Sequence, residues 1–178
     1  MRFAIMFLLF SSSAFAQNHS AAPAVPASCG SVVAQFDVKH DSSKHTLAQP
    51  EPGKALVYFF EEFEEPHGGF ITPTIRLGMD GAWVGATKGA SFLFLSVDPG
   101  EHHLCANWQS SSSQILRQFS LTSFTAETGK VYFFKVAPRV ESYHDLGNAW
   151  RKDLAQVDAD EASYLLGISS LSIPHTHK

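Results

Sequence analysis

The chain has 178 residues, with 13 Lys or Arg against 17 Asp or Glu, so its formal net charge is −4. This balance, together with the absence of a Lys/Arg cluster in the sequence, argues against nucleic acid as a partner, because phosphate binding needs a concentrated basic face. The length suits one domain with a hydrophobic core.

The first sixteen residues have the pattern of a secretory signal peptide. Arg2 supplies the positive start, Phe3–Phe10 is an unbroken apolar run, and Ala14-Phe15-Ala16 forms a small-residue cleavage site before Gln17. The apolar run is too short to span a bilayer, which takes about 20 helical residues, and no later segment is long and apolar enough. We therefore predict an exported protein, periplasmic or extracellular, with no transmembrane segment after removal of residues 1–16.

Two cysteines, Cys29 and Cys105, follow the predicted signal. In an oxidising compartment an isolated pair predicts a disulfide, and closing so long a loop is worth about 4–5 kcal/mol in the chain-entropy model. The alternative is a lipid anchor on Cys29. That motif needs an aliphatic residue shortly before the cysteine, whereas Pro26-Ala27-Ser28 stands there. We expect the disulfide.

Residues 17–52 are predicted to form a flexible N-terminal extension that carries Cys29. Ala, Pro and Ser dominate its first part, and one short piece, Val33–Val38, has the composition of a strand. Pro50-Glu51-Pro52-Gly53 is typical of a turn, so the compact domain is expected to begin at residue 53. Ala55–Phe60, which follows, is apolar or aromatic throughout and predicts a central strand covered on both faces.

Asp80-Gly81 is the strongest hairpin signal in the chain. It joins strands predicted over Ile75–Met79 and Ala82–Ala86. A two-residue turn places Trp83 over Gly78, where the missing side chain leaves room for the ring, on the face opposite the aliphatic residues. The predicted cross-strand pairs are Met79 with Ala82, Leu77 with Val84, and Gly78 with Trp83.

Phe92–Val97 predicts a buried strand that ends at Asp98-Pro99-Gly100. In the next predicted strand, His102–Trp108, successive residues point to opposite faces. The residues expected in the core are Leu104, Ala106 and Trp108. The residues expected on the outer face are His103, Cys105 and Asn107, so an extension that carries Cys29 reaches Cys105 without entering the core.

The rest of the chain adds short strands and one helix. Asp158–Leu166 predicts the helix, because Asp158 is an N-cap with Glu161 at capping-box spacing and an apolar stripe runs along one side. Together these elements indicate one all-β domain over residues 53–167, mainly an antiparallel β-sandwich with one short C-terminal helix. The other predicted segments are strands at Leu116–Thr122, Val131–Val136 and Leu154–Val157, an irregular stretch at Val140–Arg151, and a loose tail at 168–178.

Four segments, KALVYFF, RLGMDGAWVGATKG, FLFLSVDPGEHHLCANW and FTAETGKVYFFKV, follow one another between Gly53 and Val136. Their order of hydrophobic strand, "dG..vg" hairpin, "v.PG.H" turn and "aGk.YYf" strand resembles the bacterial family called domain of unknown function 2846. The resemblance implies an exported β-sandwich. Many family members look like lipoproteins, and this chain departs from them around Cys29. The family has no established activity, so the resemblance implies no catalytic residues.

Nine histidines suggest a metal site. His102 and His103 are adjacent, so strand alternation points them to opposite faces and they cannot bind one ion together. His103 could join His40, His45 or His67 only if loops converge. Zinc ligands are usually closely spaced on one element. We therefore predict no metal and no cofactor, and expect the adjacent pair to be partly buried strand residues hydrogen-bonded near the preceding turn.

The sequence offers no convincing catalytic constellation. Ser91 and Ser96 lack an elbow motif, Cys105 is expected to be paired, and Asp80 is explained by its turn. The acidic run Glu61–Glu65 lacks the Asp/Asn and Gly pattern of a calcium loop, which favours a solvated surface. We predict that the protein is not an enzyme and has no catalytic residues.

Exposed aromatic residues are the remaining candidates for a ligand-binding surface. Trp108 is assigned to the core, whereas Trp83 lies opposite the aliphatic residues of its hairpin and is expected to be exposed. The predicted ligand-binding surface therefore contains Trp83 and His103. Other aromatic residues that a sugar- or peptide-binding face could use are Trp150, Tyr58, Tyr132 and Phe70.

The leading hypothesis is a non-catalytic exported β-sandwich that binds or supports an unidentified component of the bacterial cell envelope, whether protein, peptide or glycan. It depends on the export signal, the expected disulfide, the many predicted strands and the lack of a catalytic motif. The alternative hypothesis is a secreted metal-binding protein or hydrolase that uses His103 with other histidines.

Overall fold

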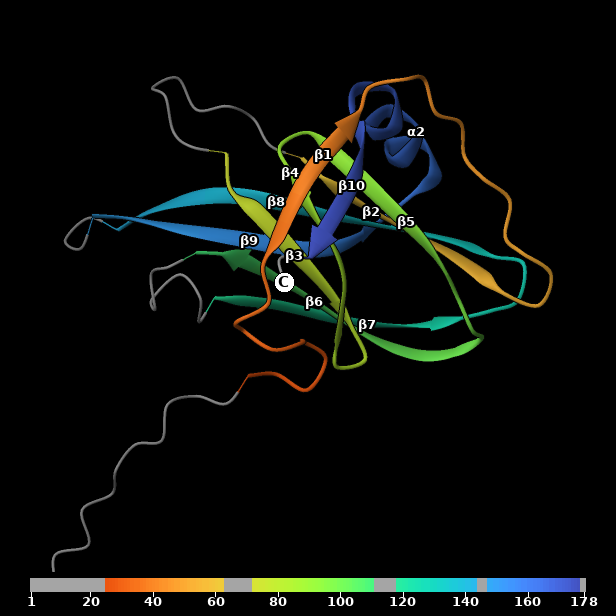
Figure 1. Cartoon of the computed structure of the whole chain (residues 1–178), viewed down its shortest axis with the longest axis horizontal. Coiled ribbons are helices and arrows are strands. Elements are labelled where there is room, and N and C mark those ends of the chain that lie inside the picture. The colour runs from red at the N-terminus through yellow and green to blue at the C-terminus, as the bar shows by residue number, and fades with distance from the viewer. Residues whose placement is uncertain (1–24, 63–71, 111–117, 144–146, 177–178) are drawn as a thin grey trace, which may run out of the picture.

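The computed structural model describes residues 25–62, 72–110, 118–143 and 147–176. The predicted signal peptide at residues 1–16 lies outside them. Two β-sheets pack face to face, and one helix covers the far side of the larger sheet (Figure 1). The prediction of an all-β sandwich with one short helix towards the C-terminal end is confirmed.

Ten strands and one helix make up the described part of the chain. They are β1 (Phe36–Asp41), β2 (Ala55–Glu61), β3 (Thr74–Met79), β4 (Ala82–Lys88), β5 (Ser91–Val97), β6 (Gly100–Gln109), β7 (Phe119–Ala126), β8 (Val131–Tyr143), β9 (Gly147–Val157), α2 (Ala159–Ile168) and β10 (Ser170–Thr176). The six-stranded sheet has the order β1-β10-β5-β2-β8-β9, and the four-stranded sheet has the order β4-β3-β6-β7. Most neighbours are antiparallel, but β2 is parallel to β8 and β10 is parallel to β5.

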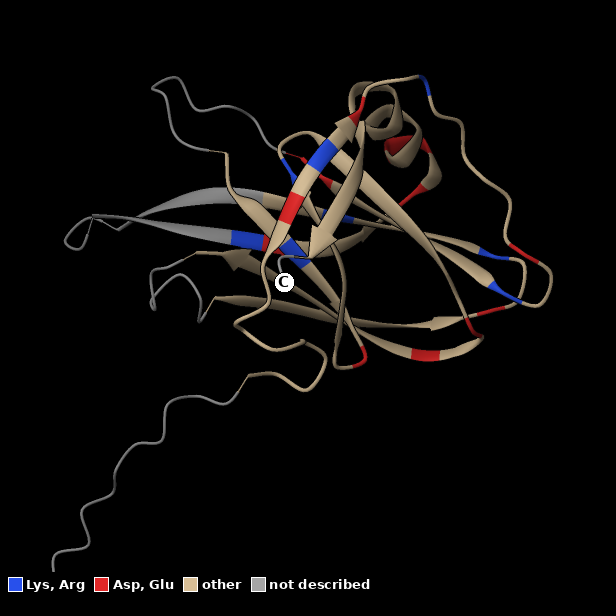
Figure 2. Ribbon diagram, in the orientation of Figure 1, with Lys and Arg blue, Asp and Glu red and all other residues tan. Residues whose placement is uncertain are grey.

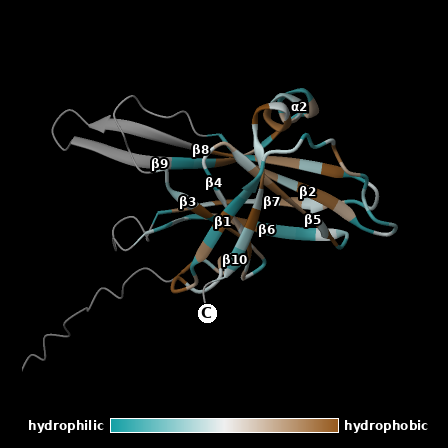
Figure 3. Cartoon of the chain, turned by 45° about the horizontal axis from the view of Figure 1, so that its top comes forward, coloured by the Kyte–Doolittle hydropathy of each residue, from teal (hydrophilic) through white to brown (hydrophobic). Residues whose placement is uncertain are grey.

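Strand β2 lies inside the six-stranded sheet, between β5 and β8, and every one of its residues is buried. Ala55, Val57 and Phe59 point into the core between the two sheets. The alternate residues, Leu56, Tyr58 and Phe60, form a second core on the opposite face of the sheet. The hydrophobic colouring of β2 in Figure 3 reflects this double burial. The sequence-based prediction of a central strand covered on both faces is confirmed.

The second core is covered by helix α2 and by part of the segment that links β1 to β2. Asp158 caps the helix by accepting hydrogen bonds from the amides of Asp160 and Glu161. Ala162 and Leu165 are buried against the sheet, and Leu47 and Ala48 pack beside them. The Glu161 carboxylate accepts a hydrogen bond from Lys135 Nζ at 2.5 Å, which ties the helix to β8.

Strands β3 and β4 form the predicted hairpin. Asp80 and Gly81 both have positive φ, 52° and 89°, as a type I′ turn requires. Gly78 pairs with Trp83 as predicted, but Leu77 pairs with Gly85, so the predicted pair of Leu77 with Val84 is wrong. The register shifts between Leu77 and Gly78, which leaves Val84 as the extra residue of a β-bulge.

Strand β6 separates core and outer residues as predicted. Leu104, Ala106 and Trp108 are buried on the side of the main core. Cys105 faces outwards and is bonded to Cys29, with 5.4 Å between the two Cα atoms. The predicted disulfide is therefore present in the structure, and it joins the N-terminal segment to the outer face of the four-stranded sheet.

Two terminal segments are more ordered than the sequence indicated. The extension predicted as flexible, residues 17–52, contributes β1, and the tail predicted as loose, residues 168–178, contributes β10. The two strands pair antiparallel from Phe36–Thr176 to Asp41–Leu171. The sequence SLSIPHT does not have a clear apolar alternation, but its backbone groups fill the ladder between β1 and β5. The prediction of a loose tail is wrong for Ser170–Thr176.

The stretch predicted as irregular, Val140–Arg151, also belongs to strands. Strands β8 and β9 pair continuously out to Tyr143 and Gly147, which extends both beyond the predicted Val131–Val136 and Leu154–Val157. Backbone pairing within a long hairpin does not need apolar side chains, which is why the polar composition misled the prediction. The predicted strands at 33–38 and 116–122 are displaced by about three or four residues along the chain, to β1 and β7.

Charged residues are dispersed over the described structure. In Figure 2 the Lys and Arg residues lie on separate strands and turns, interspersed with Asp and Glu. Within the described ranges, no helix has the length and apolar character needed to cross a bilayer.

Strand β10 is predicted to be essential for the fold. Deleting residues 170–178 removes the strand that joins β1 to β5 and leaves α2 with its C-cap residue Ser169. We expect the shortened chain to lose cooperative thermal unfolding, followed by circular dichroism. A chain that lacks only residues 177–178 is the matched control and should unfold like the full chain. Equal melting of both deletions would contradict the role of β10.

Candidate functional site: a histidine–aspartate network

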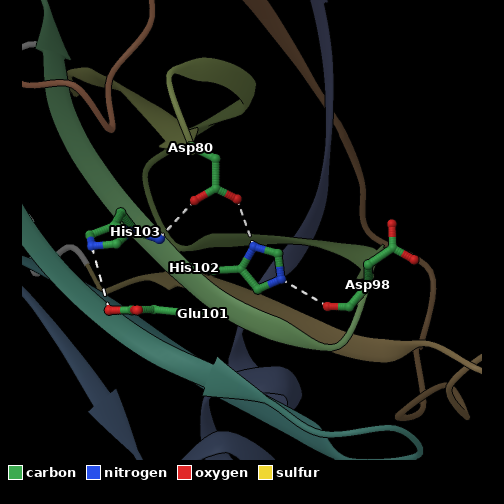
Figure 4. A network of polar contacts seen from close by, with 5 residues as sticks. All are labelled: Asp80, Asp98, Glu101, His102 and His103. Carbon is green, nitrogen blue, oxygen red and sulfur yellow. Dashed lines mark hydrogen bonds and ion pairs between the residues drawn. The ribbon is translucent and has the colours of Figure 1, made fainter.

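Asp80, in the β3–β4 turn, is bound to two successive residues of β6 (Figure 4). Its Oδ1 accepts a hydrogen bond from the His103 amide at 2.8 Å, and its Oδ2 lies 2.6 Å from His102 Nδ1. The Asp80 amide in turn donates to the His103 carbonyl oxygen at 3.0 Å. One aspartate therefore fixes the turn of the hairpin to the adjacent strand through its backbone and both carboxylate oxygens.

The ring of His102 is held on both sides. Its Nε2 lies 2.8 Å from the carbonyl oxygen of Asp98, and its face packs near Phe124, with 5.6 Å between ring centroids. A carboxylate and a carbonyl can only accept hydrogen bonds, so both ring nitrogens must carry a proton for both contacts to form. The geometry therefore favours the imidazolium form of His102.

Electrostatics agree with this protonation state. Burial alone would lower the pKa of His102, but the hydrogen bonds from its ring to the Asp98 carbonyl and the Asp80 carboxylate outweigh burial and raise it. Burial would raise the pKa of Asp80, but the His103 amide and the His102 ring outweigh it and lower that pKa. The ion pair is fully charged between these two pKa values.

An Asp–His pair can act as a general base when the second ring nitrogen faces a nucleophile. Here the second nitrogen of His102 faces the Asp98 carbonyl oxygen, so neither nitrogen is available to a substrate hydroxyl. The arrangement connects the β3–β4 turn with the β5–β6 turn. The prediction that His102 is a partly buried strand residue hydrogen-bonded near the Pro99-Gly100 turn is confirmed, as is the turn role of Asp80.

His103 points to the opposite side of β6 from His102. Its side chain is 60% exposed, against 13% for His102, and its Nε2 lies 3.7 Å from a Glu101 carboxylate oxygen. The expected position of His103 on the outer face is therefore confirmed, whereas the expectation that it is partly buried like His102 is wrong. It shares the outer face of the sheet with Cys105, two residues along the strand.

The histidines proposed as partners of His103 make other contacts. His40 Nε2 lies 2.9 Å from the Lys88 carbonyl oxygen, beside a cavity of about 390 Å³ between β1, the β4–β5 turn and β10. His45 lies 3.7 Å from an Asp41 carboxylate oxygen and packs edge-on against Phe92. His67 is outside the described residues. Over the described ranges, no group of three or more His, Cys, Asp and Glu side chains is arranged to hold a metal ion.

Trp83, the other residue predicted for a ligand surface, is half-buried rather than exposed. Its Nε1 donates a hydrogen bond to the Ser31 carbonyl oxygen at 2.7 Å, and its ring lies 4.8 Å from the Arg76 guanidinium carbon. The expectation of exposure was wrong because it left out the N-terminal segment, which the disulfide brings across this face. Trp108 is buried as predicted, and Tyr58 is buried in the second core.

Arg76 is a buried functional group that the sequence analysis missed. Its side chain is 1% exposed, although it stands on the outer side of β3. It donates to the carbonyl oxygens of Val32 and Ala34 and to the Asn107 side chain, and its neighbour Trp83 stacks on it. A charged residue at an alternate strand position predicts solvent exposure, so only knowledge of the covering segment would have identified its burial.

Glu61 was assigned to a solvated acidic loop, but the structure buries it completely as the last residue of β2. Its Oε1 accepts a hydrogen bond from the Gly89 amide at 3.0 Å, while Oε2 makes no hydrogen bond of normal geometry. Burial raises the pKa of Glu61 to about 8, against the lowering effects of the Thr87 hydroxyl and the Gly89 amide. Glu61 is therefore largely protonated at neutral pH.

Lys152, on β9, is the third buried ionisable residue that the sequence analysis missed. Its Nζ donates to the Gln118 carbonyl oxygen and lies 5.4 Å from the centroid of the Trp108 ring. Burial, with a smaller contribution from the charge of Arg76, lowers the pKa of Lys152 to about 7. It lay in a stretch without clear strand periodicity, which gave no sign that its side chain points inwards.

The ion pair of His102 with Asp80 should make stability depend on pH. The folded state raises the pKa of His102 above the unfolded value near 6.5. The stabilisation from its ion pair is therefore complete below the pKa of the unfolded chain and is lost as pH rises through the pKa of the folded state. We expect His102→Gln to cost about 1–3 kcal/mol at pH 6 and less at pH 9, measured by urea unfolding. His103→Gln, at the exposed neighbouring position, is the matched control. A cost of His102→Gln that does not vary with pH would contradict this role.

The charged form of Glu61 should destabilise the fold, whereas the charged form of His102 stabilises it. The folded state keeps its proton up to about pH 8, whereas the unfolded chain releases it near 4.5, so stability falls as pH rises between these values. Glu61→Gln removes this penalty. We expect it to raise the melting temperature at pH 8, through a stabilisation on the order of a few kcal/mol, and to have less effect at pH 5. Glu51→Gln, at an exposed position, should have no such effect, and an equal shift at both pH values would refute the assignment.

Comparison with known proteins gives no assignment for this site. No family model, no curated protein and no solved structure matches the chain. The resemblance to domain of unknown function 2846 therefore stays a prediction, and the chemistry of the site is interpreted from its own geometry. That geometry indicates a structural connection between two turns, next to an outer face that is partly covered by the N-terminal segment.

Proposed function

We propose that the protein is a non-catalytic, exported β-sandwich that binds or supports a component of the bacterial cell envelope, in line with its resemblance to domain of unknown function 2846. The observation that carries this proposal is the Cys29–Cys105 disulfide, which holds the segment after the predicted signal on the domain. Disulfides persist in oxidising compartments and are rare in the cytosol. The bond therefore supports export, and the N-terminal pattern Arg2, Phe3–Phe10 and Ala14-Phe15-Ala16 supports it independently.

The roles of the polar groups support a binding protein rather than an enzyme. His102 and Asp80 use their hydrogen-bonding groups to connect two turns, and Arg76 uses its guanidinium to hold the N-terminal segment. Groups that act on a substrate must reach it, and these groups are engaged with the fold itself. These roles support recognition rather than catalysis as the function of this part of the molecule.

The uncovered part of the outer sheet face is the surface we propose for the envelope component. His103 on β6 is paired with Ser123 on β7, and Leu121 is paired with Cys105, so these outward side chains adjoin one another. Leu121 is 53% exposed, a high value for a strand leucine, and His103 is largely exposed as well. An apolar residue beside a polar ring can contact either a peptide or the face of a sugar.

The experiment is a screen of the mature chain, residues 17–178 with the disulfide intact, against peptide and glycan arrays and solubilised envelope fractions. We expect saturable binding that unlabelled protein competes away. The double variant His103→Ser/Leu121→Ser should weaken binding at least about tenfold, equivalent to 1.4 kcal/mol. Glu51→Gln is the matched surface control.

The proposal fails if no ligand competes with unlabelled protein, or if the double variant and the control bind equally. Metal analysis of protein purified without a tag is run on the same preparation. A stoichiometric metal that is lost in His103→Ala would instead favour the secreted metal-binding protein.

A further inference from the structure

Residues 26–36, called the strap from here on, cross the outer face of the four-stranded sheet from the disulfide to the start of β1. Three side chains of the sheet hold it. Trp83 Nε1 donates to the Ser31 carbonyl oxygen at 2.7 Å, and Arg76 Nη1 donates to the carbonyl oxygens of Val32 at 2.7 Å and Ala34 at 2.8 Å.

Gln109 completes this set of contacts at the end of the strap. Its Oε1 accepts from the Phe36 amide at 2.7 Å and its Nε2 donates to the Phe36 carbonyl oxygen at 3.0 Å. The amide side chain thus pairs with Phe36 as a neighbouring strand would. All five of these hydrogen bonds join sheet side chains to backbone atoms of the strap.

Between residues 31 and 35 the strap's own side chains contribute little to its attachment, whereas Ser28, Cys29 and Phe36 nearer its ends are buried. Val33 is 80% exposed, Ser31 and Gln35 are also exposed, and Val32 and Ala34 are half-buried. A segment fixed by apolar packing would turn its large side chains towards the sheet. The face therefore recognises an extended backbone with little dependence on side-chain identity between residues 31 and 35.

Two glycines make room for this close approach. A Cβ atom on Gly30 of the strap would lie 2.5 Å from Trp83 Cδ1, and a Cβ on Gly78 of β3 would lie 3.1 Å from the Ser28 carbonyl oxygen. The face is thus shaped for a chain with glycine at one position. Gly30 is therefore a position in the strap at which the residue type matters for fit.

Arg76 gives the face its chemical preference. It is fully buried beneath the strap, and the contacts described for it are to carbonyl and amide groups and to the Trp83 ring. Carbonyl oxygens are the acceptors that replace water around this guanidinium. When the strap is displaced, the cation and the indole become a platform that another chain's carbonyl groups can cover in the same way.

The disulfide keeps the strap in place. One end of the strap continues into β1 and the disulfide fixes the other end, so the strap has a high effective concentration on the sheet and a free peptide competes poorly while both ends are held. Without the disulfide link, five hydrogen bonds and the burial of Phe36 at the β1 end hold the strap, and hydrogen bonds contribute modestly in net terms. Reduction of the disulfide to two thiols by an external dithiol, which is itself oxidised to a disulfide, therefore makes the face accessible to exchange.

We infer that the outer face of the four-stranded sheet is a groove for the backbone of an extended polypeptide, which the chain's own strap fills in the disulfide-bonded state. The partner is an extended, glycine-containing segment of another polypeptide that occupies the same positions when the strap is displaced. This inference rests on the proposed function as a binding protein, and adds to the uncovered surface around His103 and Leu121 a second surface, under the strap, whose partner is an extended polypeptide.

The test uses the mature chain with Cys29→Ser and Cys105→Ser, and a fluorescent peptide of residues 28–36 with serine at position 29. Fluorescence anisotropy should show binding to the double variant at least about tenfold tighter than to the disulfide-bonded chain. The added variant Gln109→Leu should weaken binding because it removes both hydrogen bonds to Phe36.

Two altered peptides test whether the groove recognises the backbone of its ligand rather than its side chains. A peptide with threonine in place of Val33 should bind within about threefold of the original, because that side chain is exposed. A peptide with alanine in place of Gly30 should bind at least about tenfold more weakly, because its methyl group would collide with Trp83. The reverse order of these two effects overturns the inference.

A second measurement covers the case in which the cysteine variant does not fold. In the disulfide-bonded chain, Val33→Thr and Gln35→Ala should leave the melting temperature unchanged, whereas Gln109→Leu should lower it. If the strap substitutions cost as much as Gln109→Leu, backbone recognition is wrong. If the peptide does not bind a folded double variant but envelope binding persists, the groove is refuted while the proposed function stands.

Discussion

The double burial of β2 is the constraint on which the rest of the structure depends. A strand with large apolar side chains on both faces needs a cover on each side, and a single pair of sheets supplies only one. The four-stranded sheet covers the first face, and α2 with the segment around Leu47 covers the second. This demand explains why a β-sandwich of this length has a helix and a long ordered linker attached to its larger sheet.

Ionisable groups lie at the margins of these cores, and shifts in their pKa values reduce the charge that the interior carries. Glu61 is neutral below about pH 8 and Lys152 is neutral above about pH 7, so both lose much of their charge near neutrality. Arg76 keeps its charge and is surrounded by carbonyl and amide groups. His102 instead carries its charge next to the Asp80 carboxylate. The structure thus uses three ways of burying a titratable group: neutralisation, dipolar solvation and ion pairing.

Local sequence patterns predicted those features that depend on local chemistry. The double apolar alternation of Ala55–Phe60, the Asp80-Gly81 turn, and the opposite faces of His102 and His103 all follow from residue type and strand period. The burial of Arg76 and Glu61 and the partial burial of Trp83 depend on segments distant in sequence, which no local pattern specifies. For the same reason β10 was missed, because its place is set by the open backbone edges of β1 and β5 rather than by its own side chains.

The pairing of β1 with β10 has a consequence for the order in which the protein can fold. Phe36 near one end of the described chain pairs with Thr176 near the other, and β10 joins β1 to the remainder of the larger sheet. A chain emerging from the ribosome makes β1 first and must keep its edge unpaired until β10 has been synthesised. Closure of so large a loop is entropically costly and slow. The larger sheet is therefore completed only after synthesis has passed residue 176. Until then both edges of β1 are unpaired, and binding of a chaperone there would prevent aggregation through this strand.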